Sequence, residues 1–100
     1  MRFRLSVIAM AEQELGWATE DYESERAGLG SEFHDAVSIV LRNLQQNPFL
    51  YPVSDIPGVR KAVIGRFPYC IYYEAINDQI IVYAIHDCRR DPARWRGRAR

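Results

Sequence analysis

Hydrophobic and polar positions alternate at the start of the chain. In the segment Arg2 to Ile8, apolar side chains occupy every second position, which is the pattern of a strand with one buried face. The spacing then becomes helical, with apolar side chains on one stripe and many carboxylates on the other positions. The stripe consists of Ile8, Ala11, Leu15, Ala18 and Tyr22. This part of the sequence predicts a strand followed by an acidic amphipathic helix.

A second helical stripe follows a glycine-rich turn. Gly28 and Gly30 end the first helix, because glycine adopts the backbone conformations that terminate helices. The second stripe ends at Asn47-Pro48 and consists of Leu29, Phe33, Val37, Val40 and Leu44. Two helices joined by so short a turn are expected to form an antiparallel hairpin.

The segment 47–58 is too rich in proline and glycine for regular structure, because it contains Pro48, Pro52, Pro57 and Gly58. We expect an ordered surface loop in which residues 49–51 (Phe49, Leu50, Tyr51) tuck under the helical hairpin.

Three short apolar runs, at 59–66, 69–75 and 79–86, come next. Turns around Phe67-Pro68 and Asn77-Asp78 separate them, so they are expected to form an antiparallel meander. The second and third runs are apolar on both faces, as in the central strands of a sheet.

The pair Asp91-Pro92 predicts a helix start near the C-terminus. The Asp91 side chain can accept from free N–H groups of the first turn, and proline suits the first helical position. Trp95 is expected to anchor this short helix to the sheet, with Arg94, Arg96 and Arg98 facing outward.

These elements predict one α+β domain over residues 1–100 in the order β-α-α-β-β-β. A helical hairpin packs on a four-stranded, mainly antiparallel sheet, and a short C-terminal helix or tail follows. One hundred residues suffice for a single core of two packed layers.

The sequence predicts a cytoplasmic protein that does not enter a membrane. Its apolar runs are too short to span a bilayer, and the N-terminal segment reaches acidic residues too early for a secretory signal. Cys70 and Cys88 suit a reducing compartment and lack CxxC spacing. We expect both to be reduced and to act as small strand or loop fillers.

The net charge of zero conceals an asymmetry between the two halves. Residues 1–50 carry four arginines and eight acids (4 − 8 = −4), whereas residues 51–100 carry nine basic residues and five acids (9 − 5 = +4). The segment 89–100 alone contains six arginines and one acid, Asp91. Such polarity is typical of a domain with one basic surface for an anionic partner.

Several short motifs share an order along the chain. They are Ala11–Ala18 (A-x-x-E-L-x-x-A), Tyr22-Glu23, Gly28–Gly30, Asn47–Pro52, Gly58–Arg60, Arg66–Glu74, Ile80–His86 and Arg89–Trp95. In this order they resemble toxins of the RelE/ParE superfamily. The resemblance covers nearly the whole chain, and the departures from the nuclease pattern described below place it closer to the ParE-like branch.

The resemblance implies the toxin of a type II toxin-antitoxin system, held inactive by a cognate antitoxin in a hetero-oligomer. It leaves the target open, because RelE-like members cut messenger RNA on the ribosome whereas ParE-like members poison DNA gyrase. A third alternative is an inactive member that only binds its antitoxin. Plasmid stabilisation and growth inhibition are roles associated with such toxins.

The nuclease pattern of RelE-like toxins is only partly present. Cleavage by a 2′-hydroxyl needs groups that accept and donate a proton and cations that hold the phosphate. By resemblance, Lys61 and Arg90 match two cations of the family pattern, but a second strand lysine falls on Val63 and the phosphate-binding arginine falls on Cys70. The tyrosine or histidine of the tail falls near Arg96. These departures favour gyrase inhibition and argue against an enzyme.

His86 is the residue best suited to proton transfer near neutral pH, although it could equally cap the end of its strand beside Asp87. A ribonuclease would need His86, a tyrosine such as Tyr72, or Arg90 to replace the missing groups. His34 is expected to be an exposed helical residue. No spacing matches a metal-ligand set, so we expect neither a metal nor another cofactor.

A cationic surface is the main candidate binding site, for the target or for the antitoxin. It is expected to comprise Arg60, Lys61, Arg66, Arg89, Arg90 and Arg94. The alternative is that Arg89 and Arg90 pair with Asp87, Asp91 or Glu74 and fix the tail. The acidic side chains at 20–25 are either a solvated face or, as the ParE resemblance implies, part of a target contact.

Overall fold

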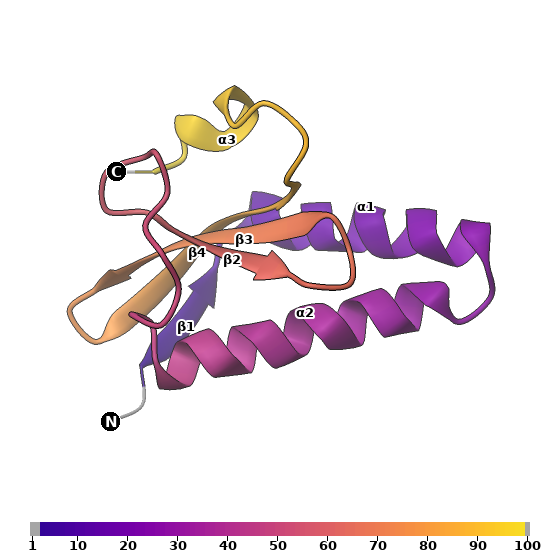
Figure 1. Ribbon diagram of the computed structural model, residues 1–100, viewed down its shortest axis with the longest axis horizontal. Coiled ribbons are helices and arrows are strands. Elements are labelled where there is room, and N and C mark those ends of the chain that lie inside the picture. The colour runs from indigo at the N-terminus through magenta and orange to yellow at the C-terminus, as the bar shows by residue number, and fades with distance from the viewer. Residues whose placement is uncertain (1–2, 100) are drawn as a thin grey trace.

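The computed structural model describes residues 3–99 and has the predicted order of elements. The chain forms β1 (Arg4–Val7), α1 (Ala9–Glu25), α2 (Leu29–Gln46), β2 (Arg60–Ile64), β3 (Tyr69–Ile76), β4 (Gln79–Asp87) and α3 (Ala93–Arg96). Helices α1 and α2 lie side by side, and α3 lies on the other side of the sheet from α2 (Figure 1). The α+β fold is therefore confirmed, with strand ends that differ by a few residues from the expected ones. Arg2, expected at the start of the first strand, lies outside the described residues.

The four strands form one sheet in the order β1-β4-β3-β2. The meander β2-β3-β4 is antiparallel, and β1 pairs in parallel with β4 from Arg4↔Gln79 to Val7↔Val82. Tyr72 pairs with Ala84 and Tyr73 with Val82, so the extra residue of a bulge at this point is Tyr83 of β4. Beyond Val82, no strand formed by residues 3–99 covers the outer side of β4.

The turn between α1 and α2 depends on two glycines. Gly28 has φ 89°, a backbone conformation that is costly for residues with a Cβ atom. A Cβ atom on Gly30 would lie 2.6 Å from the Thr19 carbonyl oxygen, so glycine lets the helices approach closely. The Glu23 carboxylate accepts hydrogen bonds from the N–H groups of both glycines, satisfying free donors at the start of α2.

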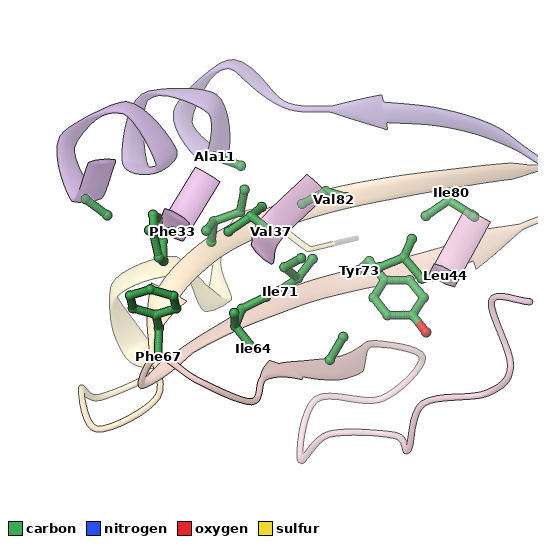
Figure 2. Close-up of a cluster of buried hydrophobic side chains, with 13 residues drawn as sticks. Ala11, Phe33, Val37, Leu44, Ile64, Phe67, Ile71, Tyr73, Ile80 and Val82 are labelled. Carbon is green, nitrogen blue, oxygen red and sulfur yellow. The ribbon is translucent and has the colours of Figure 1, made fainter. Parts of the chain in front are cut away.

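The main core lies between the helical hairpin and one face of the sheet (Figure 2). Phe33, Val37 and Leu44 of α2 point toward the strands, where Ile71 and Val82 meet them. All five of these side chains are fully buried. The helical stripes predicted from the sequence therefore form the interface with the sheet.

A smaller core covers the opposite face of the sheet. Trp95 of α3 lies on Tyr72 with ring centroids 4.1 Å apart, and Val59 and Ala84 complete the cluster with Cys70 and Tyr83. The N–H of Ala93 donates to the Asp91 carboxylate at 2.9 Å, as expected, although the helix itself begins at Ala93. The segment 88–99, called the tail below, is thus anchored by Trp95.

The loop at 47–58 packs differently from the expectation. Phe49 and Leu50 are 60% and 61% exposed and do not tuck under the helices, whereas Tyr51 packs against Tyr73 of the main core. The Tyr73 hydroxyl donates to the Pro48 carbonyl oxygen at 2.7 Å, and the Lys61 N–H donates to the Pro52 carbonyl oxygen, so these hydrogen bonds fix the path of the loop. This leaves the Phe49 and Leu50 side chains outside.

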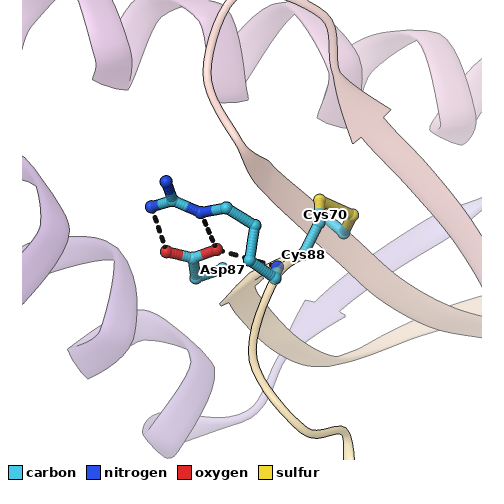
Figure 3. The surroundings of a disulfide bond; sticks show 4 residues. Cys70, Asp87 and Cys88 are labelled. Carbon is cyan, nitrogen blue, oxygen red and sulfur yellow. Dashed lines mark hydrogen bonds and ion pairs between the residues drawn. A yellow bond between two sulfur atoms is a disulfide. The ribbon is translucent and has the colours of Figure 1, made fainter.

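The two cysteines form a disulfide, which corrects the expectation of free thiols. Cys70 of β3 and Cys88, which directly follows β4, are joined with their Cα atoms 5.5 Å apart (Figure 3). The antiparallel register pairs Cys70 with His86, and this brings residue 88 within reach of residue 70. The pairing depends on the register of the two strands, which residue spacing alone does not reveal.

No helix within residues 3–99 combines the length and apolar character needed to cross a membrane.

Candidate functional site

A cleft of about 250 Å³ lies between the tail, the loop at 53–56 and the outer face of the sheet. We call it the strand cleft. Three cationic side chains line it, Lys61 of β2 with Arg90 and Arg96 of the tail, and Asp55 is the one acid among its lining residues. An excess of cations in a small concave site favours an anionic group such as a phosphate or a carboxylate.

The strand cleft can hold an anion but is poorly equipped for proton transfer. Tyr72 lies in it with the Lys61 ammonium 6.0 Å from the ring centroid. Burial, assisted by the charge of Asp55, raises the pKa of the Tyr72 hydroxyl. The sulfur of Cys88 is bonded in the disulfide, and the backbone N–H of Cys88 donates to the Pro68 carbonyl oxygen. None of the described residues that line this cleft is thus a histidine or a free thiol.

A second cleft, of about 380 Å³, lies between α1, the end of β4 and the tail. We call it the helix cleft. Trp17 of α1 lines it and is 49% exposed, which places a large apolar surface beside Arg90 and Arg94 on the tail side. Arg90 lines both clefts, so the two share one cationic residue at the root of the tail.

An ion pair closes the open edge of β4 inside the helix cleft. The Arg98 guanidinium contacts the Glu14 carboxylate at 2.9 and 3.0 Å, and the two side chains are only 18% and 12% exposed. Arg98 also donates to the Tyr83 carbonyl oxygen, and Glu14 accepts from the Ile85 N–H. The pair therefore satisfies backbone groups of β4 where β1 no longer covers them.

His86 lies beside this pair and is almost fully buried. Its Nδ1 is 3.9 Å from the Glu14 carboxylate, and its Nε2 has no hydrogen-bond partner among the described residues. Burial lowers the pKa of the His86 imidazole. The negative charge of Glu14 raises this pKa, whereas the positive charges of Arg94, Arg90 and Arg98 lower it further. A neutral imidazole facing the helix cleft is therefore favoured at pH 7, and His86 is separate from the strand cleft.

The structure distributes the six predicted cationic residues over several places. Lys61, Arg90 and Arg94 line the clefts, as described above. Arg66 forms an ion pair with Glu32 of α2, and Arg60 donates to the Tyr51 carbonyl oxygen at 2.6 Å while lying over Phe49. The predicted six thus do not converge on one site.

Arg89, the sixth cation, is held by Asp87. Its guanidinium contacts both carboxylate oxygens, at 2.9 and 2.7 Å (Figure 3). The hydrogen bonds from Arg89 hold the pKa of the Asp87 carboxyl well below its usual range, at about 2. This confirms the alternative expectation for Arg89, a side chain that fixes the root of the tail, whereas Arg90 remains at the clefts.

Sequence reasoning missed Trp17, Arg96 and the Glu14–Arg98 pair as parts of these clefts. Trp17 lies off the apolar stripe of its helix, and that position was a usable signal for an exposed aromatic residue. Arg96 lines the strand cleft, although we expected it merely to face outward. Arg98 was also expected to face outward, and its partner Glu14 lies 84 residues away in the sequence.

His34 is exposed on α2. Within residues 3–99, no three His, Cys, Asp or Glu side chains are grouped so that they could hold a metal ion.

Comparison of the structure with solved structures finds three chains of similar fold. A chain of the chromosomal ParDE system from P. aeruginosa is 20% identical, with a TM-score of 0.66, and the match covers 86% of this chain and 96% of that one. A mutant of the E. coli toxin RelE in the free state is 16% identical, with a TM-score of 0.68 and coverage of 89% and 86%. A chain of the YoeB–YefM complex from Staphylococcus aureus is 12% identical, with a TM-score of 0.56 and coverage of 86% and 97%.

No protein-family model and no curated protein sequence matches the chain. The structural matches nevertheless cover most of both chains in each comparison, and they show that this chain shares the fold of those chains.

Proposed function

We propose that the protein is the toxin of a type II toxin-antitoxin system and that it inhibits growth by poisoning DNA gyrase. The shared fold with ParE, RelE and YoeB chains supports the toxin role. The observation that favours gyrase over RNA cleavage is the strand cleft, which combines three cations with no histidine or free thiol among its described lining residues. A surface of this kind binds an anionic partner without needing to transfer a proton.

The partner that keeps the toxin inactive is proposed to be a cognate antitoxin. Two of the structural matches come from systems whose names pair a toxin with a second protein, ParDE and YoeB–YefM. The basic strand cleft and the exposed Trp17 of the helix cleft favour an antitoxin segment that carries carboxylates and apolar side chains. We propose that the two proteins form a hetero-oligomer in the cytoplasm.

A second candidate function is ribosome-dependent cleavage of messenger RNA. It is favoured by the convergence of Lys61, Arg90 and Arg96 around Tyr72, since such a group of donors can hold a phosphodiester. It requires Tyr72 to transfer a proton although burial raises its pKa. His86 would have to reach the same substrate from the helix cleft.

Purified components separate these functions. The chain is added to DNA gyrase with relaxed plasmid, and separately to a reconstituted translation system with a defined message. We expect loss of supercoiling and an intact message. The double variant Lys61→Gln/Arg90→Gln should inhibit at least about tenfold less, because removing a charged contact costs roughly 1.5–3 kcal/mol, while Arg42→Gln on the exposed surface of α2 serves as the control. Cleavage of the message with normal supercoiling would contradict the proposal.

A further inference from the structure

One of the two cysteines of the disulfide, Cys88, lines the strand cleft. Cys70 is fully buried in β3, whereas Cys88 is half-buried and lines the cleft. A thiol that enters the cleft therefore meets Cys88 first. Thiol-disulfide exchange requires this access, because the attacking sulfur must approach one sulfur of the bond.

The surroundings of Cys88 select the kind of thiol. Lys61, Arg90 and Arg96 line the same cleft, against the single carboxylate of Asp55. These cations attract a negatively charged molecule and stabilise its thiolate form, which is the reactive species. The volume of about 250 Å³ admits a small molecule and excludes a folded protein.

We propose that Cys88 is a site of reversible modification by an anionic low-molecular-weight thiol, one that carries a carboxylate or a similar acidic group. The thiolate attacks Sγ of Cys88, a new sulfur–sulfur bond forms, and the Cys70–Cys88 bond breaks. The electron pair leaves with Sγ of Cys70, which takes up the proton that the attacking thiol lost. One disulfide is exchanged for another, so no additional oxidant or reductant is consumed.

The fold is expected to tolerate this reaction. Strands β3 and β4 pair from Tyr69↔Asp87 to Ile76↔Gln79, a ladder that extends well beyond the disulfide. The bidentate contact between Asp87 and Arg89 holds the root of the tail independently, and the main core lies on the other face of the sheet. The modification therefore fills the strand cleft and leaves the sheet intact.

If the strand cleft contacts the target, as the proposed function requires, the modification also weakens inhibition of that target. This consequence rests on the proposed function. The thiol-disulfide exchange at Cys88 is independent of the proposed function, so the exchange and the loss of inhibition are tested by different readouts.

The test compares three thiols of similar size on the intact chain: 2-mercaptoethanesulfonate (anionic), 2-mercaptoethanol (neutral) and 2-aminoethanethiol (cationic). The reaction is stopped with acid, the adduct is counted by intact mass and located by peptide mapping, and rates are expressed per thiolate. We expect the adduct on Cys88 and a rate at least about tenfold higher for the anionic than for the cationic thiol at low ionic strength. The difference should shrink toward unity near 1 M salt, where charges are screened over about 3 Å.

Matched variants test the origin of the selectivity. Arg90→Gln/Arg96→Gln should remove most of the preference for the anionic thiol, whereas Arg42→Gln should retain it. Amide hydrogen exchange in β3 and β4 checks that each variant keeps its sheet. The proposal is overturned by equal rates for the three thiols, by an adduct on Cys70, or by a preference that survives loss of both arginines. Each of these results stands whether or not the chain inhibits gyrase.

Discussion

The two faces of the sheet are covered in different ways. Helices α1 and α2 bury one face in a continuous apolar core (Figure 2). The other face carries a small cluster around Trp95, and the tail that covers it is held by a disulfide, by Asp87–Arg89 and by Glu14–Arg98. We therefore expect apolar packing on the helix-covered face to contribute more to stability, whereas the tail-covered face uses a few specific links and leaves room for the cationic strand cleft.

The strongest test of this difference is Phe33→Ala in the helix-covered core. The Phe33 ring is fully buried and lies within 5.2 Å, centroid to centroid, of Tyr22, Phe67 and Tyr69. Its removal should lower the free energy of unfolding by about 3–5 kcal/mol through lost burial and a new cavity. Urea denaturation measures this loss. As a control, Ile39→Ala at an exposed position of the same helix should change the free energy of unfolding by less than about 0.5 kcal/mol. Equal losses in the two variants would contradict the assignment of the core.

The next largest effect is expected from Glu14→Gln. The change leaves the largely buried Arg98 guanidinium without its carboxylate, at a cost of about 2–4 kcal/mol. The double variant Glu14→Gln/Arg98→Met should recover part of this loss, and Glu12→Gln, exposed on the same helix, is the control. A cost for Glu14→Gln no larger than that for Glu12→Gln would show that the pair does not hold the tail.

Asp87→Asn should have a smaller effect that depends on pH. The folded-state pKa of Asp87, about 2, lies below the unfolded value, so its contribution is present above about pH 4 and is lost as the pH falls toward 2. We expect a loss of about 1 kcal/mol at pH 7, because solvent screens the exposed Arg89 partner. The difference from wild type should vanish near pH 2, and a difference that is constant from pH 7 to 2 would refute this account.

The smallest effect concerns His86, whose folded-state pKa is lowered mainly by burial. Folding therefore favours the neutral imidazole, and its contribution is present above the unfolded pKa of about 6.5 and declines as the pH falls below it. Glu14 opposes this loss, whereas Arg90, Arg94 and Arg98 add to it. The stability of His86→Gln should fall less than that of wild type between pH 7 and 5 in urea titrations, and an identical decline would exclude His86 as its source.

The helix-covered face was also the more predictable one. Apolar residues at helical spacing, such as Phe33 and Val37, specify which side of a helix is buried, and alternation around Leu5 specifies a strand. Local chemistry likewise located the start of α3 to within two residues of Asp91, whose carboxylate accepts from the first turn. These features depend on neighbours in the sequence, so periodicity and capping suffice to find them.

The tail-covered face was predicted less well because its contacts join distant residues. The disulfide depends on the register of β3 against β4, and Glu14 meets Arg98 only after the tail has crossed the edge of β4. Charge counting identified a basic tail but could not separate Arg89, which is paired with Asp87, from Arg90, which lines both clefts. Resemblance to a family supplied the expected fold, and the contacts of individual side chains came only from the structure.

The most direct test of the proposed function is induced expression of the chain in a bacterial host that lacks the proposed antitoxin. Plasmid supercoiling, the DNA-damage response and the integrity of translated messages are measured in the same cells. Gyrase poisoning predicts arrested growth with relaxed or damaged DNA and intact messages. Cleaved messages with normally supercoiled DNA, or unimpaired growth, would contradict it.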